Sequence, residues 1–299
     1  MKNSYLFHYG KSNLFIYIFA VSFLLLNIKS ISAQEQPAAK PETAESQESK
    51  REERKKNVKW VNPDIKAFEG LSHHVLQSKA LGHEVGYAVW LPAKYAQKTK
   101  KHYPVIYFLH GMGGSESADA PSFSRIVSKA IEEGILPPVI CVFPNGGVSF
   151  YRDEVEKMII DEIIPTIDTN YRTIAKGKSR ALAGFSMGGF GSVYLSVQYP
   201  DMFCAAGSMG GGLWRMGEEF KQATEKAIPV WKKNNNGFFF VNGDKDRPEA
   251  FKEFAENLTE KEIENQLVVI PDLDHNLGLY YERSADQMLK LLAKHLKTK

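Results

Sequence analysis

Leu182-Ala183-Gly184-Phe185-Ser186-Met187-Gly188-Gly189, in the middle of the chain, contains the spacing Gly-x-Ser-x-Gly. A short apolar run, residues 181–183, leads into the serine, and the small and apolar residues 190–198 behind it are typical of a helix. Strand, sharp turn and helix in this order predict a nucleophile elbow, which holds its serine in strained backbone angles at the carboxyl end of a sheet. The flanking glycines keep side chains from colliding where strand and helix nearly touch. Ser186 is therefore the predicted nucleophile.

The pentapeptide by itself is a weak signal. At average usage of Gly and Ser, this spacing arises by chance in roughly one chain in ten of this length. Its meaning depends on whether the rest of the chain supplies a base, an acid and oxyanion donors in a suitable order.

Apolar runs and helical patterns alternate along the folded part of the chain. Residues 71–77 and 84–91 are predicted to be two antiparallel strands, and the continuous apolar run 104–109 fits a parallel strand covered on both faces. Further strands are expected at 139–143, 180–185, 203–208, 238–241 and 266–270, and helices at 123–133, 154–170 (with a bend at Pro165), 248–258 and 284–296. The fold class is therefore α/β, a three-layer sandwich around a mostly parallel central sheet. Cys141 and Cys204 lie in separate apolar runs and are expected to be buried free thiols.

The first 33 residues have the features of a secretory signal peptide. Lys2 and Lys11 form a basic start, residues 14–26 are largely apolar, and the small residues 30–33 are compatible with cleavage after Ala33. The apolar run is short for a membrane span, and an uncleaved anchor is the alternative. We expect a secreted or periplasmic protein with no stable membrane insertion after signal removal.

Residues 34–57 are dominated by Gln, Glu, Lys, Arg, Ala, Pro and Ser, with no aromatic residue. Such a composition cannot bury enough apolar area to offset its ordering entropy. We predict a disordered linker over residues 34–59 and a folded domain over residues 60–299.

The charge balance gives no reason to expect a nucleic-acid partner. The whole chain has a formal net charge of +3, and the first 33 residues contribute three lysines and no acid, so the mature chain is neutral. A neutral chain lacks the attraction that draws proteins to nucleic acid or to anionic membranes. The sequence predicts no oligomeric state.

Loops that leave the carboxyl ends of strands are where open α/β sheets place their sites. Of the eight histidines, His275 both follows Ser186 and lies in such a loop, so it is the candidate base. The base needs an acid to hold its tautomer, and the strand at 238–241 delivers two candidates, Asp244 and Asp246. The order serine, aspartate, histidine is that of an α/β-hydrolase. Other histidines are interpreted as surface residues: His73, His74, His83, His102 and His295.

The same chemistry needs preorganised donors for an oxyanion. The amide of Met187, at the start of the helix after the elbow, is one candidate. The Gly-rich loop 110–114 offers the other, the amide of Met112. A plain turn or a phosphate cradle is the alternative for this loop, but the Gly-Lys-Ser/Thr of a phosphate loop is absent. We expect no metal and no organic cofactor.

Four segments in combination carry a family resemblance: Leu109-His110-Gly111-Met112-Gly113-Gly114-Ser115, Asp161-Glu162-Ile163-Ile164-Pro165, Gly184-Phe185-Ser186-Met187-Gly188-Gly189 and Tyr199-Pro200-Asp201-Met202-Phe203. Together they resemble the esterase D group of α/β-hydrolases. This group includes the feruloyl and acetyl-xylan esterases of carbohydrate esterase family one, S-formylglutathione hydrolases, enterochelin-type esterases and mycolyltransferases. The resemblance extends over nearly all of the chain from Val75 to the C-terminus.

The resemblance also bears on individual residues. In this group the acid follows a strand-end glycine by three residues, which favours Asp246 after Gly243, and the second oxyanion donor follows His-Gly, which matches Met112. Many of the esterases that act on plant cell walls carry a tryptophan shortly after the histidine, whereas Tyr280 and Tyr281 follow here. That departure concerns the acyl or sugar preference, not the triad.

The resemblance implies a secreted serine carboxylesterase that acts through an acyl-enzyme, on a small ester or an acylated polysaccharide. Feruloyl or acetyl esters on plant-type polysaccharide are the expected substrates. One alternative is an S-formylglutathione hydrolase-like esterase, which the signal peptide disfavours. Another is an acyltransferase of the mycolyltransferase type, in which a sugar alcohol replaces water. An inactive polysaccharide-binding module is the third, and the complete Ser-Asp-His set argues against it.

Aromatic residues near the predicted loops are candidates for substrate binding. Phe150, Tyr151 and Trp214 are the candidates, and Trp231 lies in the same excursion of the chain as Trp214. The alternative at each position is that the aromatic ring only packs against the protein.

Overall fold

The structure is a computed structural model that describes residues 57–213 and 216–299. The predicted signal peptide, most of the predicted linker and Trp214 lie outside the described residues. No helix in the described part is both long and apolar enough to cross a membrane.

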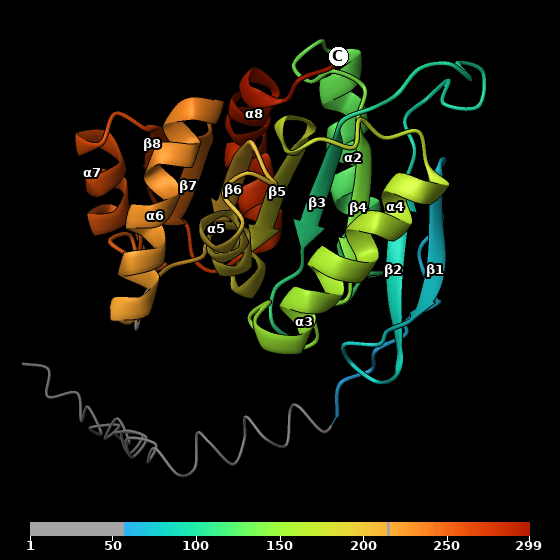
Figure 1. Ribbon diagram of the computed structural model, residues 1–299, viewed down its shortest axis with the longest axis horizontal. Coiled ribbons are helices and arrows are strands. Elements are labelled where there is room, and N and C mark those ends of the chain that lie inside the picture. Colours follow the sequence, from blue (N-terminus) through green and yellow to red (C-terminus); the bar gives the residue numbers. More distant parts are fainter. Residues whose placement is uncertain (1–56, 214–215) are drawn as a thin grey trace, which may run out of the picture. The chain divides into compact units, whose positions relative to one another are not determined.

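Eight strands of the described residues form one sheet, in the order β1-β2-β4-β3-β5-β6-β7-β8 (Figure 1). The strands β1 (Leu71–Gln77) and β2 (Glu84–Trp90) form an antiparallel hairpin, and β2 also pairs antiparallel with β4. The remaining neighbours pair in parallel. Their bounds are Val105–Leu109 for β3, Ile140–Pro144 for β4, Arg180–Phe185 for β5, Ala205–Met209 for β6, Gly237–Gly243 for β7 and Glu264–Ile270 for β8. This confirms the predicted α/β class with a mostly parallel sheet.

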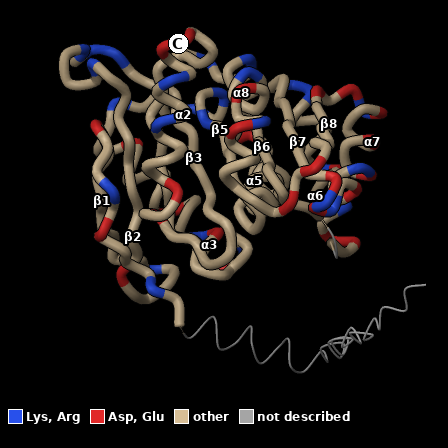
Figure 2. The backbone as a smooth tube through the Cα atoms, turned by 180° about the vertical axis from the view of Figure 1, so that it is seen from behind, with Lys and Arg blue, Asp and Glu red and all other residues tan. Residues whose placement is uncertain are grey.

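Helices cover both faces of the sheet (Figure 1). One face packs against α2 (Ala120–Glu132) and α8 (Leu277–His295), which lie in front in the view of Figure 2. The other face is covered by α3 (Asp153–Lys157), α4 (Ile164–Asn170), α5 (Met187–Gln198), α6 (Glu218–Asn234) and α7 (Lys252–Glu260). A short 3-10 helix, Gly177–Ser179, precedes β5. The three layers match the predicted sandwich.

Strand β3 explains why its sequence is a continuous apolar run. Val105, Tyr107 and Leu109 belong to the core on one face of the sheet, whereas Ile106 and Phe108 belong to the core on the other. All five side chains are buried. Each large apolar side chain removed from water contributes roughly 1.5–3 kcal/mol, so a central strand needs apolar residues at every position.

The strand order also places the site. From β3 the chain passes to β4 on one side, whereas β5 pairs on the other side of β3. Ligands of open α/β sheets bind beyond the carboxyl ends of the strands at such a reversal of order. The loops after β3 and β5 are the Gly-rich loop 110–114 and the elbow.

The helix predicted over residues 154–170 is interrupted close to its proline. It consists of α3, a π-helix over Met158–Ile163 and then α4. Pro165 lies in the first turn of α4, and the helical backbone continues into that turn from the π-helix. A proline at such a position has no N–H to donate and crowds the carbonyl four residues earlier, here that of Asp161 within the π-helix.

Both cysteines are buried free thiols, as expected. Cys141 lies on β4 and Cys204 directly precedes β6, and β3 and β5 separate these strands. Burial raises the pKa of both thiols, that of Cys204 to about 12. A thiol with such a pKa is protonated and behaves as a small apolar side chain.

Two histidines interpreted as surface residues are not at the surface. His295 is 2% exposed, with Nδ1 2.6 Å from the carbonyl oxygen of Asn235, and burial lowers its pKa. Gly237 makes room for it, because a Cβ there would lie 2.1 Å from His295 Nε2. The side chain of His73 is 10% exposed and contacts a buried carboxylate. The polar residues beside these histidines in the sequence suggest an exposed segment, but they point to other faces of their elements than the histidines do.

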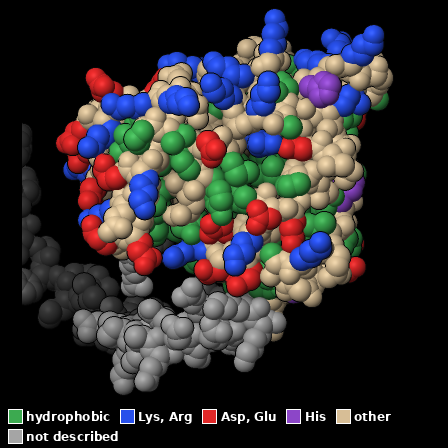
Figure 3. All heavy atoms as spheres, in the orientation of Figure 1, with side chains coloured by type: hydrophobic (Ala, Val, Ile, Leu, Met, Phe, Trp, Pro, Cys, Tyr) green, Lys and Arg blue, Asp and Glu red, His purple; other side chains and the backbone are tan. Residues whose placement is uncertain are grey.

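Basic side chains gather away from the carboxyl ends of the strands. Figure 3 shows Lys and Arg along the upper edge of the domain, near the amino ends of the parallel strands. Exposed lysines of the segments before β3 and β5 contribute there: Lys94, Lys98, Lys100, Lys176 and Lys178. The loops that carry the predicted catalytic residues are at the opposite end.

Candidate active site

Ser186 lies between β5 and α5 in a strained conformation. Its φ of 55° and ψ of −114° fall outside the regions that residues with side chains usually adopt. A strained backbone conformation of this kind costs of order 1–3 kcal/mol of folding free energy, and it persists only where the surrounding structure holds it in place. The amide of Ser186 donates to the carbonyl of Met209 at 2.8 Å, and its own carbonyl accepts from the amide of Phe190 at 3.0 Å. The backbone of the elbow is therefore fixed from both sides.

Glycines allow three elements to meet at the elbow. A Cβ on Gly188 would lie 1.8 Å from the carbonyl oxygen of Leu109, at the end of β3. A Cβ on Gly184 would lie 2.3 Å from the carbonyl oxygen of Gly188. Strand β5, helix α5 and strand β3 thus approach more closely than any side chain permits, which is the physical reason for glycine at both positions.

A continuous hydrogen-bonded array joins Ser186, His275 and Asp246. His275 Nε2 lies 2.8 Å from Ser186 Oγ, and His275 Nδ1 lies 2.6 Å from Asp246 Oδ2. His275 comes from the loop after β8 and Asp246 from the loop after β7. The side chain of Asp246 is 4% exposed and that of His275 is 41% exposed, so the acid is buried behind a base that solvent and substrate can reach.

Asp244, the other candidate acid, lies elsewhere. It is exposed, and its Oδ1 accepts from the amide of Leu273 at 3.4 Å. Its own amide donates to the carbonyl of Ile270 at 3.0 Å. The structure thus brings Asp246, and not Asp244, against His275.

Asp246 has two further partners that the sequence analysis does not identify. The hydroxyl of Tyr280 donates to Asp246 Oδ2 at 2.7 Å and accepts from the amide of Gly243 at 2.8 Å. The guanidinium of Arg247 lies 3.3 Å from Asp246 Oδ1. No sequence pattern points to Tyr280, because its contact depends on how α8 packs beside the loop after β7.

The Gly-rich loop 110–114 lies beside the elbow. A Cβ on Gly111 would lie 3.4 Å from Ser186 Cβ, so the backbone of the loop runs next to the predicted nucleophile. Met112 is 39% exposed, and Met187 is buried as the first residue of α5. An amide in that first turn has no intrahelical partner and is suited to an anion.

The interior of the protein supports this loop through His110. The amide of Gly146 donates to His110 Nε2 at 2.9 Å, so Nδ1 carries the proton and donates to the carbonyl of Gly111 at 2.8 Å. Burial lowers the pKa of His110 and keeps the ring neutral. The hydroxyl of Tyr151 donates to the carbonyl of His110 at 3.0 Å.

The aromatic candidates for substrate binding lie in different surroundings. Tyr151 is fully buried, so it supports the loop and offers no surface to a substrate. Phe150 is partly exposed, and its ring packs edge-on against Phe190 with centroids 5.7 Å apart. Trp231 lies in the core, 4.8 Å from the ring of Phe238. Of these residues, Phe150 is placed beside the elbow helix with part of its surface free.

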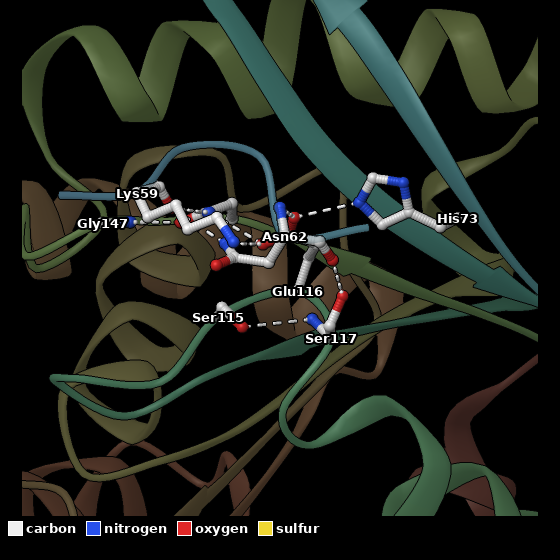
Figure 4. Close-up of polar contacts among 8 residues, drawn as sticks. Lys59, Asn62, His73, Ser115, Glu116, Ser117 and Gly147 are labelled. Atoms are coloured by element: carbon white, nitrogen blue, oxygen red, sulfur yellow. Dashed lines mark hydrogen bonds and ion pairs between the residues drawn. The ribbon is translucent and has the colours of Figure 1, made fainter. Parts of the chain in front are cut away.

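A buried carboxylate follows the Gly-rich loop. Glu116 is 0% exposed, and its Oε1 accepts from the amide of Asn62 at 2.5 Å and from His73 Nε2 at 3.0 Å (Figure 4). Its Oε2 accepts from the side-chain amides of Asn62 at 3.0 Å and Asn145 at 2.8 Å. Four N–H donors thus compensate a charge that is out of water, as burial requires.

This carboxylate connects the start of the domain to the loops after β3 and β4. The side-chain amide of Asn145 also donates to the carbonyl of Lys59 at 3.0 Å, and the hydroxyl of Ser117 donates to the carbonyl of Asn62. Lys59, the last residue of the predicted linker, therefore contacts the domain. No sequence pattern points to Glu116, because its partners Asn62, His73 and Asn145 come from three separate segments.

A pocket of about 810 Å³ opens beside the Gly-rich loop. Its size is within the range of small-molecule sites. Three segments line it: the start of the domain (Asn57, Val58, Lys59, Asn62), the loop after β3 (Met112, Gly113, Gly114, Ser115) and the loop after β4 (Asn145, Gly147, Val148). In the part of the chain that the structure describes, no group of three or more His, Cys, Asp or Glu side chains is arranged to hold a metal ion.

Comparison with known proteins agrees with this geometry. A family described as "Putative esterase" matches residues 78–287, which is more than half of the chain. An endo-1,4-beta-xylanase/feruloyl esterase from Xylanibacter ruminicola is 33% identical over 221 residues, 69% of this chain. An esterase from Mycobacterium tuberculosis is 34% identical over 151 residues, 47% of this chain. The matched regions are 29% and 32% of these relatives, so the chain spans about a third of their length.

Solved structures share the fold. A ferulic acid esterase aligns with a TM-score of 0.64 and 24% identity over 75% of this chain and 98% of its own. A ferulic acid esterase of carbohydrate esterase family one from Anaeromyces mucronatus, in complex with ferulic acid, aligns with a TM-score of 0.61 and 20% identity. The alignment covers 81% of this chain and 99% of that protein. An S-formylglutathione hydrolase from Agrobacterium tumefaciens aligns with a TM-score of 0.59 and 17% identity, over 78% of this chain and 98% of that protein. The chain therefore belongs to the esterase family whose model matches residues 78–287, and it has the fold of α/β-hydrolase esterases.

Proposed function

We propose that this esterase hydrolyses feruloyl or acetyl esters on plant-type polysaccharide, through an acyl-enzyme on Ser186. The observation that carries the mechanism is the position of His275, hydrogen-bonded to Ser186 Oγ through Nε2 and to Asp246 Oδ2 through Nδ1. A serine hydroxyl with such a base is an activated nucleophile, and the buried acid holds the imidazole in the tautomer that accepts the proton.

Acylation follows from this arrangement. Ser186 Oγ attacks the ester carbonyl carbon while His275 Nε2 takes the hydroxyl proton. The carbonyl oxygen becomes negative and accepts hydrogen bonds from the amides of Met112 and Met187. The tetrahedral intermediate then breaks its bond to the alcohol, which leaves with the proton from His275.

Deacylation repeats these steps with water in place of the serine. His275 takes a proton from water as the water attacks the acyl carbon, and the carbon–Oγ bond breaks. Ser186 recovers its proton from His275, and the carboxylic acid is released. Asp246 remains ionised throughout and stabilises the imidazolium in both halves of the reaction.

The choice of substrate rests on the relatives and on the pocket. Feruloyl esterase is part of the name of the Xylanibacter relative, which shares 33% identity with this chain. The pocket of about 810 Å³ adjoins the loop that carries the proposed oxyanion donor Met112, so it is the proposed binding site for part of the substrate. The predicted signal peptide directs the enzyme outside the cytoplasm, where polysaccharide is found.

A product analysis tests the substrate. Residues 34–299 are incubated with feruloylated arabinoxylan, acetylated xylan and S-formylglutathione, and released ferulate, acetate and glutathione are measured against a Ser186→Ala control. Ferulate or acetate release is expected, with no ester formed on an added sugar acceptor. Turnover of S-formylglutathione alone, or transfer to the acceptor in place of hydrolysis, would contradict the proposal.

A further inference from the structure

Tyr280 occupies a buried position behind the array of Ser186, His275 and Asp246. It is 0% exposed, in the first turn of α8. Its hydroxyl accepts from the amide of Gly243 at 2.8 Å and donates to Asp246 Oδ2 at 2.7 Å. The acceptor bond fixes the direction of the hydroxyl proton, because the remaining O–H then points at the carboxylate.

The oxygen that Tyr280 contacts is the one that His275 uses. Asp246 Oδ2 lies 2.6 Å from His275 Nδ1, so two donors share this oxygen while Arg247 faces Oδ1. The space around it is closed: a Cβ on Gly210 would lie 2.9 Å from Asp246 Oδ2 and 3.3 Å from Tyr280 Cε2. The carboxylate therefore cannot rotate without losing one of these bonds.

We propose that Tyr280 is a positioning residue for the reaction: its hydroxyl holds Asp246 Oδ2 in line with His275 and sets how strongly the carboxylate stabilises the imidazolium. This inference rests on the proposed roles of Ser186, His275 and Asp246. Burial, and then the neighbouring Asp246, raises the pKa of the Tyr280 hydroxyl above its ordinary value, so it remains a donor at every pH where the enzyme works.

The charge effect of this hydrogen bond has a definite sign. A hydroxyl that donates to a carboxylate withdraws negative charge from the oxygen that it contacts. Without it, Asp246 attracts the imidazolium more strongly, and the protonated, inactive form of His275 persists to higher pH. At the same time the carboxylate loses one of the hydrogen bonds that hold it in line with His275, so kcat decreases.

Other charged groups near His275 act equally in the parent and the variants. Besides Asp246, the loop after β7 carries Asp244, Lys245 and Arg247, and the loop of His275 carries Asp272 and Asp274. Lys245 pairs with Asp272 at 2.8 Å, and both are exposed, so water and salt screen them.

Tyr281 provides a matched control. Its hydroxyl is buried with no hydrogen-bond partner among the described residues, and its ring lies 6.2 Å from that of Phe108 and 6.1 Å from that of Phe123. Tyr280→Phe and Tyr281→Phe therefore remove the same atom from adjacent positions, with a hydrogen bond to the triad at one position and none at the other.

The experiment measures kcat and KM for a short-chain nitrophenyl ester from pH 4.5 to 9 on both variants, with thermal unfolding in parallel. Tyr280→Phe is expected to reduce kcat about 10-fold to 100-fold, the loss typical of a hydrogen bond to a charged group, with KM within about twofold. The acidic limb of its kcat/KM profile is expected to move to higher pH, and Tyr281→Phe is expected to match the parent enzyme in both respects. An unshifted acidic limb in Tyr280→Phe, or the same change in both variants, would overturn the inference.

A second replacement keeps the test decisive if Tyr280→Phe does not fold. Fluorotyrosine at position 280 retains the ring and makes the hydroxyl a stronger donor, so the acidic limb is expected to move to lower pH. No movement, or movement to higher pH, would contradict the inference. Ser186→Ala and the product analysis distinguish this inference from the proposed function: if Ser186→Ala is inactive and the parent enzyme releases ferulate or acetate, while Tyr280→Phe behaves as the parent enzyme, the role of Tyr280 fails and the proposed function stands.

Discussion

His275 Nε2 lies 2.8 Å from Ser186 Oγ, although their positions differ by 89 in the sequence. The two residues leave the carboxyl ends of β5 and β8, which β6 and β7 separate in the sheet. The loop after β8 therefore reaches back across two strands, and the ring of Phe185 supports the imidazole from 4.7 Å. In the proposed mechanism, this contact between the serine and a base from a distant strand activates the hydroxyl of Ser186.

Asp246→Asn and Asp244→Asn are expected to differ strongly in activity. Asparagine at 246 cannot stabilise the imidazolium and favours the wrong tautomer of His275, so kcat should fall by about 10³-fold to 10⁴-fold. Asparagine at 244 alters an exposed turn and should leave kcat within about threefold. Steady-state kinetics on a nitrophenyl ester checks this, and the opposite order of losses would assign the acid to Asp244.

Glu116→Gln is expected to weaken both the fold and the site. In glutamine an NH2 group replaces one carboxylate oxygen and faces the two N–H donors that this oxygen accepts in the parent protein, so the free energy of unfolding should decrease by about 2–3 kcal/mol. Because Asn145 and Asn62 line the pocket beside the Gly-rich loop, KM for the polysaccharide ester should also rise. Denaturant unfolding and kinetics measure the two effects.

Glu133→Gln is the control for that change, since the side chain of Glu133 is 45% exposed. Equal unfolding free energies in Glu116→Gln and Glu133→Gln would show that the buried hydrogen bonds of Glu116 contribute nothing to stability.

Asp119→Asn is expected to stabilise the protein at neutral pH. Burial raises the pKa of the Asp119 carboxyl to about 6, above its ordinary value of 3.8. Ionisation is then easier in the unfolded chain, so Asp119 lowers the free energy of unfolding as pH rises from about 4 to about 6, and the loss persists above that range. The N-terminus of α2 opposes the effect by favouring the anion, which leaves a gain of about 1–2 kcal/mol for the variant at pH 7.

Measuring the free energy of unfolding at two pH values tests whether ionised Asp119 destabilises the protein. The difference between Asp119→Asn and the parent protein should be present at pH 7 and absent at pH 4. A gain at pH 4 that equals the gain at pH 7 would mean that the carboxylate charge is not its cause.

The sequence predicted the parts of this molecule that depend on neighbouring residues. The elbow could be predicted because a strand, a serine between glycines and a helix follow one another without interruption. The central strands could be predicted because the runs that end at Leu109 and Phe185 are largely apolar, as buried strands of a parallel sheet are. Placing each residue after a strand predicted Ser186, His275 and a choice between Asp244 and Asp246, and the family resemblance favoured Asp246.

The parts that escaped prediction depend on tertiary packing. Tyr280 contacts Asp246 only because α8 lies beside the loop after β7, and Glu116 gathers donors from segments as distant as Asn62 and Asn145. His295 is buried because Gly237 leaves space for its ring. None of these relationships has a local pattern, so single-sequence periodicity cannot reveal them.

The role of Ser186 is tested most directly by the identity of the residue that an active-site-directed reagent modifies. The protein is treated with a fluorophosphonate, which forms a phosphonate ester with an activated serine as fluoride leaves, and the labelled peptide is located by mass spectrometry. We expect one equivalent of label on Ser186, complete loss of nitrophenyl ester turnover, and neither label nor turnover in folded Ser186→Ala. Label on another residue, or turnover by Ser186→Ala comparable to that of the parent enzyme, would rule out Ser186 as the nucleophile.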